Sequence, residues 1–322
     1  MLRRELDRAL ALGFVPDPAA DLRVCEAPDG LIRMAVVGPD YDLLVSAADR
    51  ERAAAYQERV GRLTWYFICT RPRVRVVADG VDMDAKNLVL PFQLMRDDGS
   101  TKEYVWQQAT PSWMDGVQVE AGGRVVRFER KGASSVPQNA ALLAQHHLPA
   151  VWTALGTESF DLRVHYIGRA RGKEEESCAL DRLASHEKYQ RVMEEVLEDE
   201  HRNRDVWLVL ASGTTMHLLS GHREDTPQAH AHLKQGDERA RQILTERDRV
   251  DLVEALLIHY FKPHLNVQHV NSLGLKHKVL MQCRRAKITG VMLTYNTHDL
   301  GLSLYTEAVS RQFQHSLRVP LV

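Results

Sequence analysis

Apolar and polar residues follow one another along the first half of this chain in patterns that predict two helices and then a series of strands. Leu2, Leu6 and Leu10 recur at helical spacing, and a second helical stretch rich in Ala, Glu and Arg covers residues 46–62. Residues 63–131 contain short apolar runs: LTWYFICT, VRVVAD, NLVLPFQLM, EYVWQQ, VQVE and RVVRFER. The segments between them, ADG, RDDGS, SWMDG and EAGG, favour hairpin turns because Gly and Asp tolerate positive φ.

The second half has a mixed pattern that begins after residues 132–140 (GASSVPQNA), a stretch with the composition of a linker. Strands are expected around Val151, over residues 164–167 and over residues 206–213. Helices are expected over residues 179–199 and 238–260, the second ended by a proline. Two strand-like runs, ITGVMLTY and LGLSLYTEAV, are separated by NTHD, a predicted turn.

These patterns predict an α+β protein in three parts. Residues 1–135 are expected to form a β-rich N-terminal domain, residues 145–270 a small α/β domain with a mixed sheet flanked by helices, and residues 271–322 a basic C-terminal β extension.

Composition argues against a disordered chain and against a membrane span. Of 322 residues, 44% are hydrophobic, and no stretch approaches the roughly 18 consecutive apolar residues that cross a bilayer. The N-terminus lacks the apolar segment of a signal peptide. The four cysteines lie far apart with no C-x-x-C pair, which favours reduced thiols and a cytoplasmic location over a zinc knuckle or a disulfide framework.

Charge is distributed unevenly, although the chain as a whole has a net charge of −1. Residues 255–322 contain eight Lys or Arg and two Asp or Glu, a net of +6, so residues 1–254 have a net of −7. A basic final segment suits a polyanion such as nucleic acid, and a solvated basic tail is the alternative. The basic residues expected to contact nucleic acid are Arg169, Lys188, Lys276, Lys278, Arg284, Arg285 and Lys287.

Residues that can carry out chemistry occur in order through the second half of the chain. The run VHYIG (164–168), which contains Tyr166, ends a predicted strand at a glycine. Arg182 and His186 follow on a predicted helix, four residues apart and therefore on the same face. Glu254 lies in the segment VEALLIHYFKPHLN, and Asn266 ends that segment beyond its proline.

This ordered set resembles the GIY-YIG nuclease family over about residues 149–267. The resemblance implies a strand–helix–strand–helix core and an endonuclease that uses Mg²⁺ or Mn²⁺ on nucleic acid, with DNA favoured over RNA. It also implies a catalytic site made of five residues, with Glu254 as the metal ligand: Tyr166, Arg182, His186, Glu254 and Asn266.

The residue types suit hydrolysis of a phosphodiester. Glu254 offers the hard oxygen ligand that Mg²⁺ prefers, and Arg182 can bind phosphate oxygens bidentately. Tyr166 and His186 can orient or deprotonate the attacking water, with His186 closer to neutral pH in its ordinary pKa. The family gives Asn266 a supporting role, which is to position the glutamate and the turn.

The first motif of the family, GIY in the strand before YIG, is degenerate in the segment where we expect it. That segment is Ala150-Val151-Trp152, so a tryptophan would replace the first tyrosine. An indole donates one hydrogen bond but cannot lose a proton to act as a base. Either Tyr166 and His186 activate the water, or the chain is a weakened or inactive member.

Two further groups are expected to be structural. Four histidines lack an acidic or cysteine partner at a recognised spacing, which predicts a polar loop in preference to a zinc site: His217, His222, His230 and His232. Three tryptophans are expected to pack in the core or on a sheet face in preference to stacking on bases: Trp65, Trp106 and Trp113.

The expected function is therefore a divalent-metal-dependent endonuclease in restriction, antiviral defence or a mobile element. The N-terminal domain would provide target recognition, a partner contact or self-association as a homodimer, and no membrane partner is expected. Two alternatives stay open. One is a catalytically impaired protein of the same fold that binds nucleic acid without cutting it, and the other is a protein-interaction scaffold.

Overall fold

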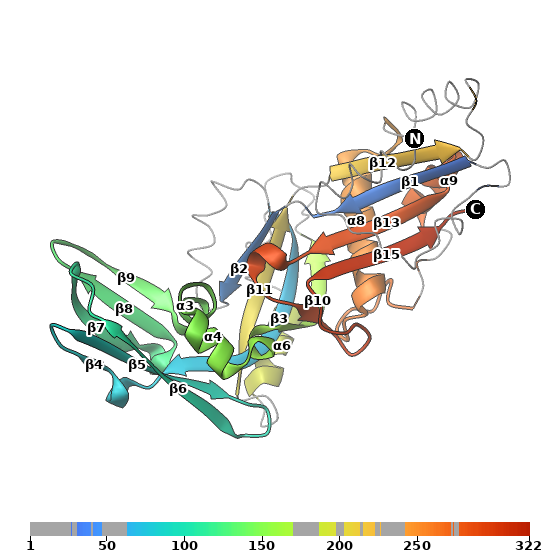
Figure 1. The fold of residues 1–322 in the computed structure, drawn as a ribbon. Helices are drawn as coiled ribbons and strands as arrows, with labels where there is room; N and C mark the ends of the chain where they lie inside the picture. The colour runs from blue at the N-terminus through green and yellow to red at the C-terminus, as the bar shows by residue number, and fades with distance from the viewer. Residues whose placement is uncertain are drawn as a thin grey trace.

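The computed structural model describes residue 27 and residues 31–39, 41–46, 63–169, 187–197, 203–212, 215–222, 226, 242–271, 273 and 277–322. Strands and helices are mixed within these residues, with strands predominating, so the predicted α+β class is confirmed. One sheet has four strands, β12, β1, β13 and β15, and Figure 1 shows it at one end of the molecule with a group of hairpins at the other. The helices predicted over residues 2–12 and 46–62 lie outside the described residues, apart from Ser46, which is in a strand.

The largest sheet has eight strands and is organised around one long strand, β3 (Leu63–Val76). The strand order is β14-β10-β3-β11-β2, and β5 pairs with the second half of β3, with β4 and β6 attached to β5. The remaining bounds are β2 (Tyr41–Ser46), β4 (Asp82–Met83), β5 (Asn87–Met95), β6 (Thr101–Ala109), β10 (Leu162–Arg169), β11 (Arg204–Ser212) and β14 (Leu304–Tyr305).

The first half of β3 is almost continuously apolar because both of its faces are covered. Trp65 and Phe67 face the main core, to which helix α8 (Glu246–Phe261) contributes. Tyr66 and Ile68 face a second, smaller core beneath helix α6 (Glu187–Leu197). The alternation of side chains along one strand therefore separates two cores.

The second sheet has four strands in the order β12-β1-β13-β15. Its strands are β1 (Leu31–Gly38), β12 (Thr215–His222), β13 (Gly290–Asn296) and β15 (Gln314–Pro320). Helix α9 (Lys278–Arg285) packs against α8 beside this sheet (Figure 1). The α8 helix begins later than the predicted residue 238 because Thr245 caps it, with reciprocal hydrogen bonds to Asp248 that form a capping box.

A large insertion, residues 77–161, separates β3 from β10 and forms the hairpins of Figure 1. It includes β4 to β6 and a three-stranded sheet of β7 (Met114–Glu120), β8 (Val125–Arg130) and β9 (Ala133–Asn139). Its helices are α3 (Ala140–His147) and α4 (Pro149–Leu155). The short 3-10 helices of the described residues are η3 (Ala78–Gly80), η4 (Ala121–Gly123), η5 (Thr157–Phe160) and, near the C-terminus, η7 (His298–Leu300).

Two predicted elements of this insertion are wrong. The expected linker, residues 132–140, is mostly strand β9, which pairs with β8 through backbone hydrogen bonds that do not depend on apolar side chains. The strand expected around Val151 is helix α4, whose first residue is Pro149, a residue preorganised for that position.

The predicted boundaries at residues 135 and 271 do not separate sheets. The eight-stranded sheet combines β2 and β3 from the first range with β10 and β11 from the second and β14 from the third. The four-stranded sheet likewise combines β1, β12 and β13. Strand pairing over long sequence separations joins the ranges, and local composition does not report such pairing.

Near the C-terminus the predicted NTHD turn (residues 296–299) is confirmed, since its last two residues begin the 3-10 helix η7. Only Leu304–Tyr305 of the run LGLSLYTEAV is a strand. Trp65 is fully buried as expected and Trp106 packs against the core, whereas Trp113 is 46% exposed. Within the described residues, no helix has the length and apolar character needed to cross a membrane.

Candidate active site

The YIG motif lies at the end of β10, where this strand pairs with the first half of β3. The pairing is antiparallel and places Gly168 opposite Tyr66 and Tyr166 opposite Ile68. The register shifts between Val164 and Tyr166, so His165 is an extra residue in β10, as in a β-bulge. Bulges re-aim side chains, and this one lies directly beside the motif.

Two tyrosines, one from each strand, approach each other over Gly168. The ring centroids of Tyr66 and Tyr166 are 6.1 Å apart, with the rings inclined by 33°. A Cβ atom at Gly168 would lie 2.6 Å from the Tyr66 hydroxyl oxygen and 2.7 Å from a ring carbon of Tyr166. Such distances are too short for real contacts, so glycine is the residue that lets both rings occupy this face. Tyr66 is buried and Tyr166 is half-buried.

The segment in which the first motif was expected, residues 150–152, is not a strand. Ala150-Val151-Trp152 belongs to helix α4, and Trp152 packs against the main core. The strand that pairs with YIG is β3, whose segment Thr64-Trp65-Tyr66 ends in a tyrosine opposite the YIG glycine. Because residues 77–161 separate the two strands, the partner strand is not the segment just upstream of YIG.

Asn266 binds the outer edge of β10 through both ends of its carboxamide. Its Nδ2 donates to the carbonyl oxygen of Ile167 at 2.8 Å, and its Oδ1 accepts from the Ile167 N–H at 2.9 Å. The Leu265 N–H donates to the carbonyl oxygen of His165 at 3.2 Å. The turn after α8 therefore extends the hydrogen bonding of the strand at the motif. An amide suits this task because it both donates and accepts.

Glu254 faces the end of the same strand from helix α8. Its Oε2 lies 2.9 Å from Nε of Arg169, the last residue of β10, and Asp251 forms a second ion pair with Arg169. Asp251 and Glu254 are three residues apart and therefore adjacent on the helix surface. All three side chains are between 19% and 29% exposed. Arg169, expected to contact nucleic acid, thus holds two carboxylates in this structure.

The two carboxylates fit the divalent cation that the family resemblance implies. Mg²⁺ takes hard oxygen ligands, and sites with one or two carboxylates are common for it. Partial exposure of both side chains leaves room for the waters that Mg²⁺ retains. A cation bound at Glu254 would compete with Arg169 for the carboxylate oxygens of Asp251 and Glu254.

Two histidines near Arg169 have lowered pKa values. Burial is the first cause of the lowered pKa of His269, and the positive charges of Arg169 and His259 add to it. The pKa of His277 is lowered by burial and then by His269 and Arg169. The two rings lie 5.6 Å apart, centroid to centroid. Burial and neighbouring positive charge therefore make both imidazoles harder to protonate than an exposed histidine.

The other predicted site residues lie elsewhere or outside the described residues. Arg182, His186 and Lys276 fall outside them. Lys188 is on α6, where it pairs with Glu187 at 3.2 Å. The remaining four are exposed on α9, which packs against α8, or just after it: Lys278, Arg284, Arg285 and Lys287.

Sequence reasoning missed Tyr66 and Asp251. The signal for Asp251 was present, because it lies one turn before Glu254 on a predicted helix. The signal for Tyr66 was a tyrosine in a strongly apolar strand run, which by itself is indistinguishable from a core residue.

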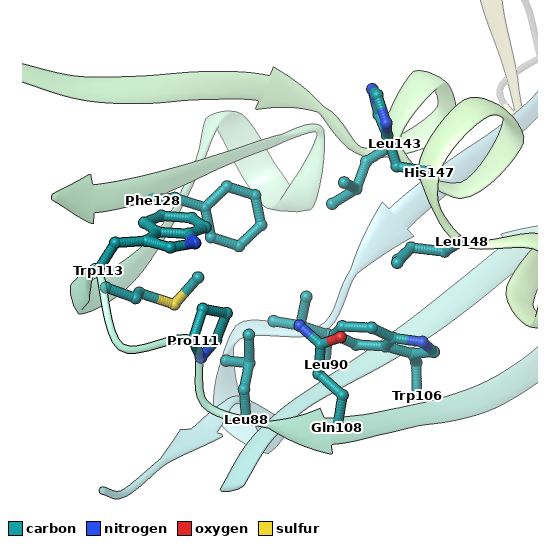
Figure 2. Close-up of a pocket in the computed structure, with 11 residues that line it drawn as sticks. Leu88, Leu90, Trp106, Gln108, Pro111, Trp113, Phe128, Leu143, His147 and Leu148 are labelled. Atoms are coloured by element: carbon teal, nitrogen blue, oxygen red, sulfur yellow. The ribbon is translucent and has the colours of Figure 1, made fainter. Parts of the chain in front are cut away.

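An apolar pocket of about 230 Å³ lies in the insertion. Figure 2 shows Trp113 and Phe128 on one side of it, Trp106 and Gln108 on another, and His147 above them from α3. His147 is the one ionisable side chain that lines the pocket. The pocket therefore lacks the groups that phosphodiester chemistry requires, and the YIG strand end is the better candidate for an active site.

Comparison of the chain with family models, with curated proteins and with solved structures gives no match in any of the three.

Proposed function

We propose that this protein is a divalent-metal-dependent endonuclease of the GIY-YIG type, with DNA as the favoured substrate. The observation that carries the proposal is the pair Tyr66 and Tyr166, brought together over Gly168 by the β3–β10 pairing. The strand beside YIG is therefore β3, which has a tyrosine, Tyr66, opposite Gly168, and not the segment that contains Trp152. The same strand end is bound by Glu254 through Arg169 and by Asn266 through Ile167.

The proposed reaction is hydrolysis of a phosphodiester. The oxygen of a water molecule forms a bond to phosphorus, the bond from phosphorus to one sugar oxygen breaks, and the products are a phosphate monoester and a hydroxyl. Glu254, with Asp251 beside it, would hold the cation, which supplies charge stabilisation at the phosphate when bound. Arg182 would bind the remaining phosphate oxygens bidentately.

The proton of the attacking water needs an acceptor close to the motif. Tyr166, Tyr66 and His186 are the family-type candidates, and the rings of the two tyrosines lie beside each other at the motif. The leaving sugar oxygen takes up a proton from solvent or from the acid form of one of these groups. Asn266 holds the backbone of Ile167 and thereby fixes the orientation of the neighbouring Tyr166.

The main alternative is a protein of the same fold that binds nucleic acid without cutting it. The sequence left that alternative open because Trp152 would stand in place of the first tyrosine. Tyr66 removes this reason, since a phenol can orient water or exchange a proton and an indole cannot. A nuclease with a large non-catalytic insertion suits restriction, antiviral defence or a mobile element, and we place the proposal in that class.

A plasmid-nicking assay with Mg²⁺, and with EDTA in place of Mg²⁺, tests the proposal. Cleavage by the full chain should require Mg²⁺. Glu254→Gln should abolish it while leaving DNA binding intact, and Tyr66→Phe should lower the rate roughly 10²- to 10⁴-fold, the usual contribution of a general acid–base group.

Trp152→Phe is the matched control, because it changes the residue that the sequence alone had placed at the first motif. It should leave the cleavage rate within a few fold of the parent chain. DNA binding without cleavage by the parent chain would support the non-cutting alternative, and the absence of both would support a scaffold.

A further inference from the structure

A second group of possible metal ligands lies on the α6 side of the large sheet. The bulge in β10 leaves His165 outside the regular register, and its ring reaches Thr70 of β3, with Nε2 at 2.7 Å from Oγ1. Glu195 on α6 and His264, after α8, lie next to it. One ligand atom from each of these three residues lies within 4.8 Å of the other two.

The separations of these ligand atoms are close to those found around a bound cation. Nε2 of His264 is 3.4 Å from Oε2 of Glu195, and the rings of His165 and His264 are 5.0 Å apart at their centroids, edge to face. Around a tetrahedral zinc ion with Zn–N bonds of about 2.0 Å, neighbouring ligand atoms lie roughly 3.3 Å apart. Small rotations of the two more exposed side chains, Glu195 and His264, would therefore bring all three to bonding distance.

His165 is held in place by a chain of hydrogen bonds. It is 4% exposed, and Thr70 Oγ1, its partner, also accepts from Nη1 of Arg204 at 3.0 Å. Two further nitrogens of Arg204 donate to the carboxylate of Asp97 at 2.8 and 2.6 Å. Metal-binding histidines usually donate their second ring N–H to such an outer partner, which fixes the tautomer and the ring orientation.

We infer that His165, Glu195 and His264 bind a divalent transition-metal ion of the zinc class, with solvent in the fourth position. Two imidazoles and one carboxylate are a ligand set that zinc takes, whereas Mg²⁺ and Ca²⁺ prefer oxygen ligands throughout. The partial exposure of Glu195 and His264 gives a hydrated ion a route to the site. This site is separate from the carboxylates Asp251 and Glu254.

The three ligands come from the three segments that meet at the YIG motif. His165 precedes Tyr166 in β10, His264 lies two residues before the carboxamide of Asn266, and Glu195 lies on α6. An ion here would join these segments and hold the turn after α8 against the strand. Its role is therefore to position and stabilise the motif.

Zinc stoichiometry of the full chain tests this inference. The purified protein is treated with EDTA, exchanged into buffer with excess Zn²⁺, passed through a desalting column and analysed for bound zinc. The parent chain should retain one equivalent that Glu195→Gln and His264→Ala lose. Zinc should also raise the midpoint of thermal unfolding in the parent and not in these two variants.

Two controls separate this site from other effects. Glu187→Gln changes an exposed carboxylate on the same helix, and His298→Ala changes an exposed histidine elsewhere, so both should keep the zinc equivalent and the thermal shift. Zinc retained in full by Glu195→Gln and His264→Ala would place the ion elsewhere, for example at the histidines of residues 228–232, and would overturn the inference. The absence of zinc from the parent chain would also overturn the inference. His165 would then be only a hydrogen-bonded core histidine beside the ion pair of Glu195 and His264.

The measurement needs no DNA and no cleavage, so its outcome is independent of the nuclease proposal. A chain that binds zinc at this site and cuts nothing would keep the inference and lose the proposed function. A chain that cuts with Mg²⁺ and binds no zinc would do the reverse.

Discussion

Gly168 determines which side chains can meet at the motif, because it has no Cβ atom and so leaves room for two tyrosine rings. The Tyr66 ring occupies the volume that a side chain at residue 168 would need, and a Cβ there would also strike Tyr166. Tyr66 is 1% exposed and packed against the second core, so it cannot easily move aside. The glycine of a YIG motif therefore does more than end a strand here, because it admits a second tyrosine from the neighbouring strand.

His315 is a buried histidine whose protonation should destabilise the fold. It is 0% exposed and packs against the rings of Tyr260, Phe261 and Tyr295. Burial lowers its pKa from 6.5 to about 4. Between pH 6.5 and about pH 4, His315 is therefore protonated in the unfolded chain and neutral in the folded chain. The free energy of unfolding decreases as the pH falls through this range.

We expect His315→Phe to reduce this acid sensitivity. Between about pH 7 and pH 4.5 the parent chain should lose about 2–3 kcal/mol of unfolding free energy through this residue, a loss that the variant should not show. Urea unfolding at the two pH values measures both quantities. Other histidines with lowered pKa values, such as His146, act in the same direction in both chains and cancel in the comparison. Equal losses in the parent and the variant would show that His315 does not titrate as inferred.

At the scale of elements, β3 has the greatest influence on the fold. Its first half pairs with β10 and β11 and its second half with β5 of the insertion. One continuous strand thus connects the motif sheet to the hairpins and presents alternate residues to two cores. The contact between the turn after α8 and the edge of β10 is the other connection on which the motif depends.

Asn266→Asp should weaken that second connection. The aspartate keeps an acceptor for the Ile167 N–H but loses the Nδ2 donor to the Ile167 carbonyl oxygen, so one partly buried acceptor loses its partner. We expect a loss of about 1–3 kcal/mol in unfolding free energy, measured by urea denaturation. Under the proposed function the cleavage rate should fall as well.

Asn203→Asp is the matched control for this substitution. Asn203 also donates through Nδ2 to a backbone carbonyl, that of Arg96, at 2.9 Å, but in an exposed position where water can replace the bond. Its replacement should cost less than about 0.5 kcal/mol. Equal costs for the two variants would mean that the bond to Ile167 contributes no more than a surface contact.

At the scale of the molecule, the structure shows where part of the positive charge of residues 255–322 lies. Four of the basic residues after residue 255 are exposed on or beside α9, which packs against α8, the helix that also bears Asp251 and Glu254. Under the proposed function, these basic side chains would attract nucleic acid towards the helix that bears the two carboxylates.

Replacing Lys278, Arg284, Arg285 and Lys287 by glutamine should weaken binding to all DNA sequences alike. Each neutralised phosphate releases condensed counterions, so the log–log dependence of affinity on salt should flatten by about 0.9 for each phosphate that the variant leaves unneutralised. Fluorescence anisotropy with labelled duplexes at several salt concentrations measures the slope. Lys86→Gln with Lys131→Gln, two exposed changes in the insertion, is the control and should leave the slope unchanged. Unchanged slope and affinity in the fourfold variant would identify these residues as a solvated surface.

Local sequence determined what depends on neighbouring residues. Strand β5 coincides with its predicted run, Asn87–Met95, because alternating burial is readable from residues two apart. The end of α8 follows from a proline, and the YIG strand from its apolar run and its glycine. These are effects of periodicity and of local backbone conformation, which a short window of sequence contains.

Tertiary structure decided which strands and side chains meet. Tyr66 reaches Gly168 across residues 77–161, Asn266 reaches Ile167 at the edge of β10, and His165 reaches Glu195 and His264 through a bulge. No window of sequence contains these pairs, because strand pairing is a long-range choice made by the burial of whole sheet faces. For the same reason the predicted domain boundaries do not coincide with the boundaries between sheets. Each of the two larger sheets contains strands from all three predicted ranges.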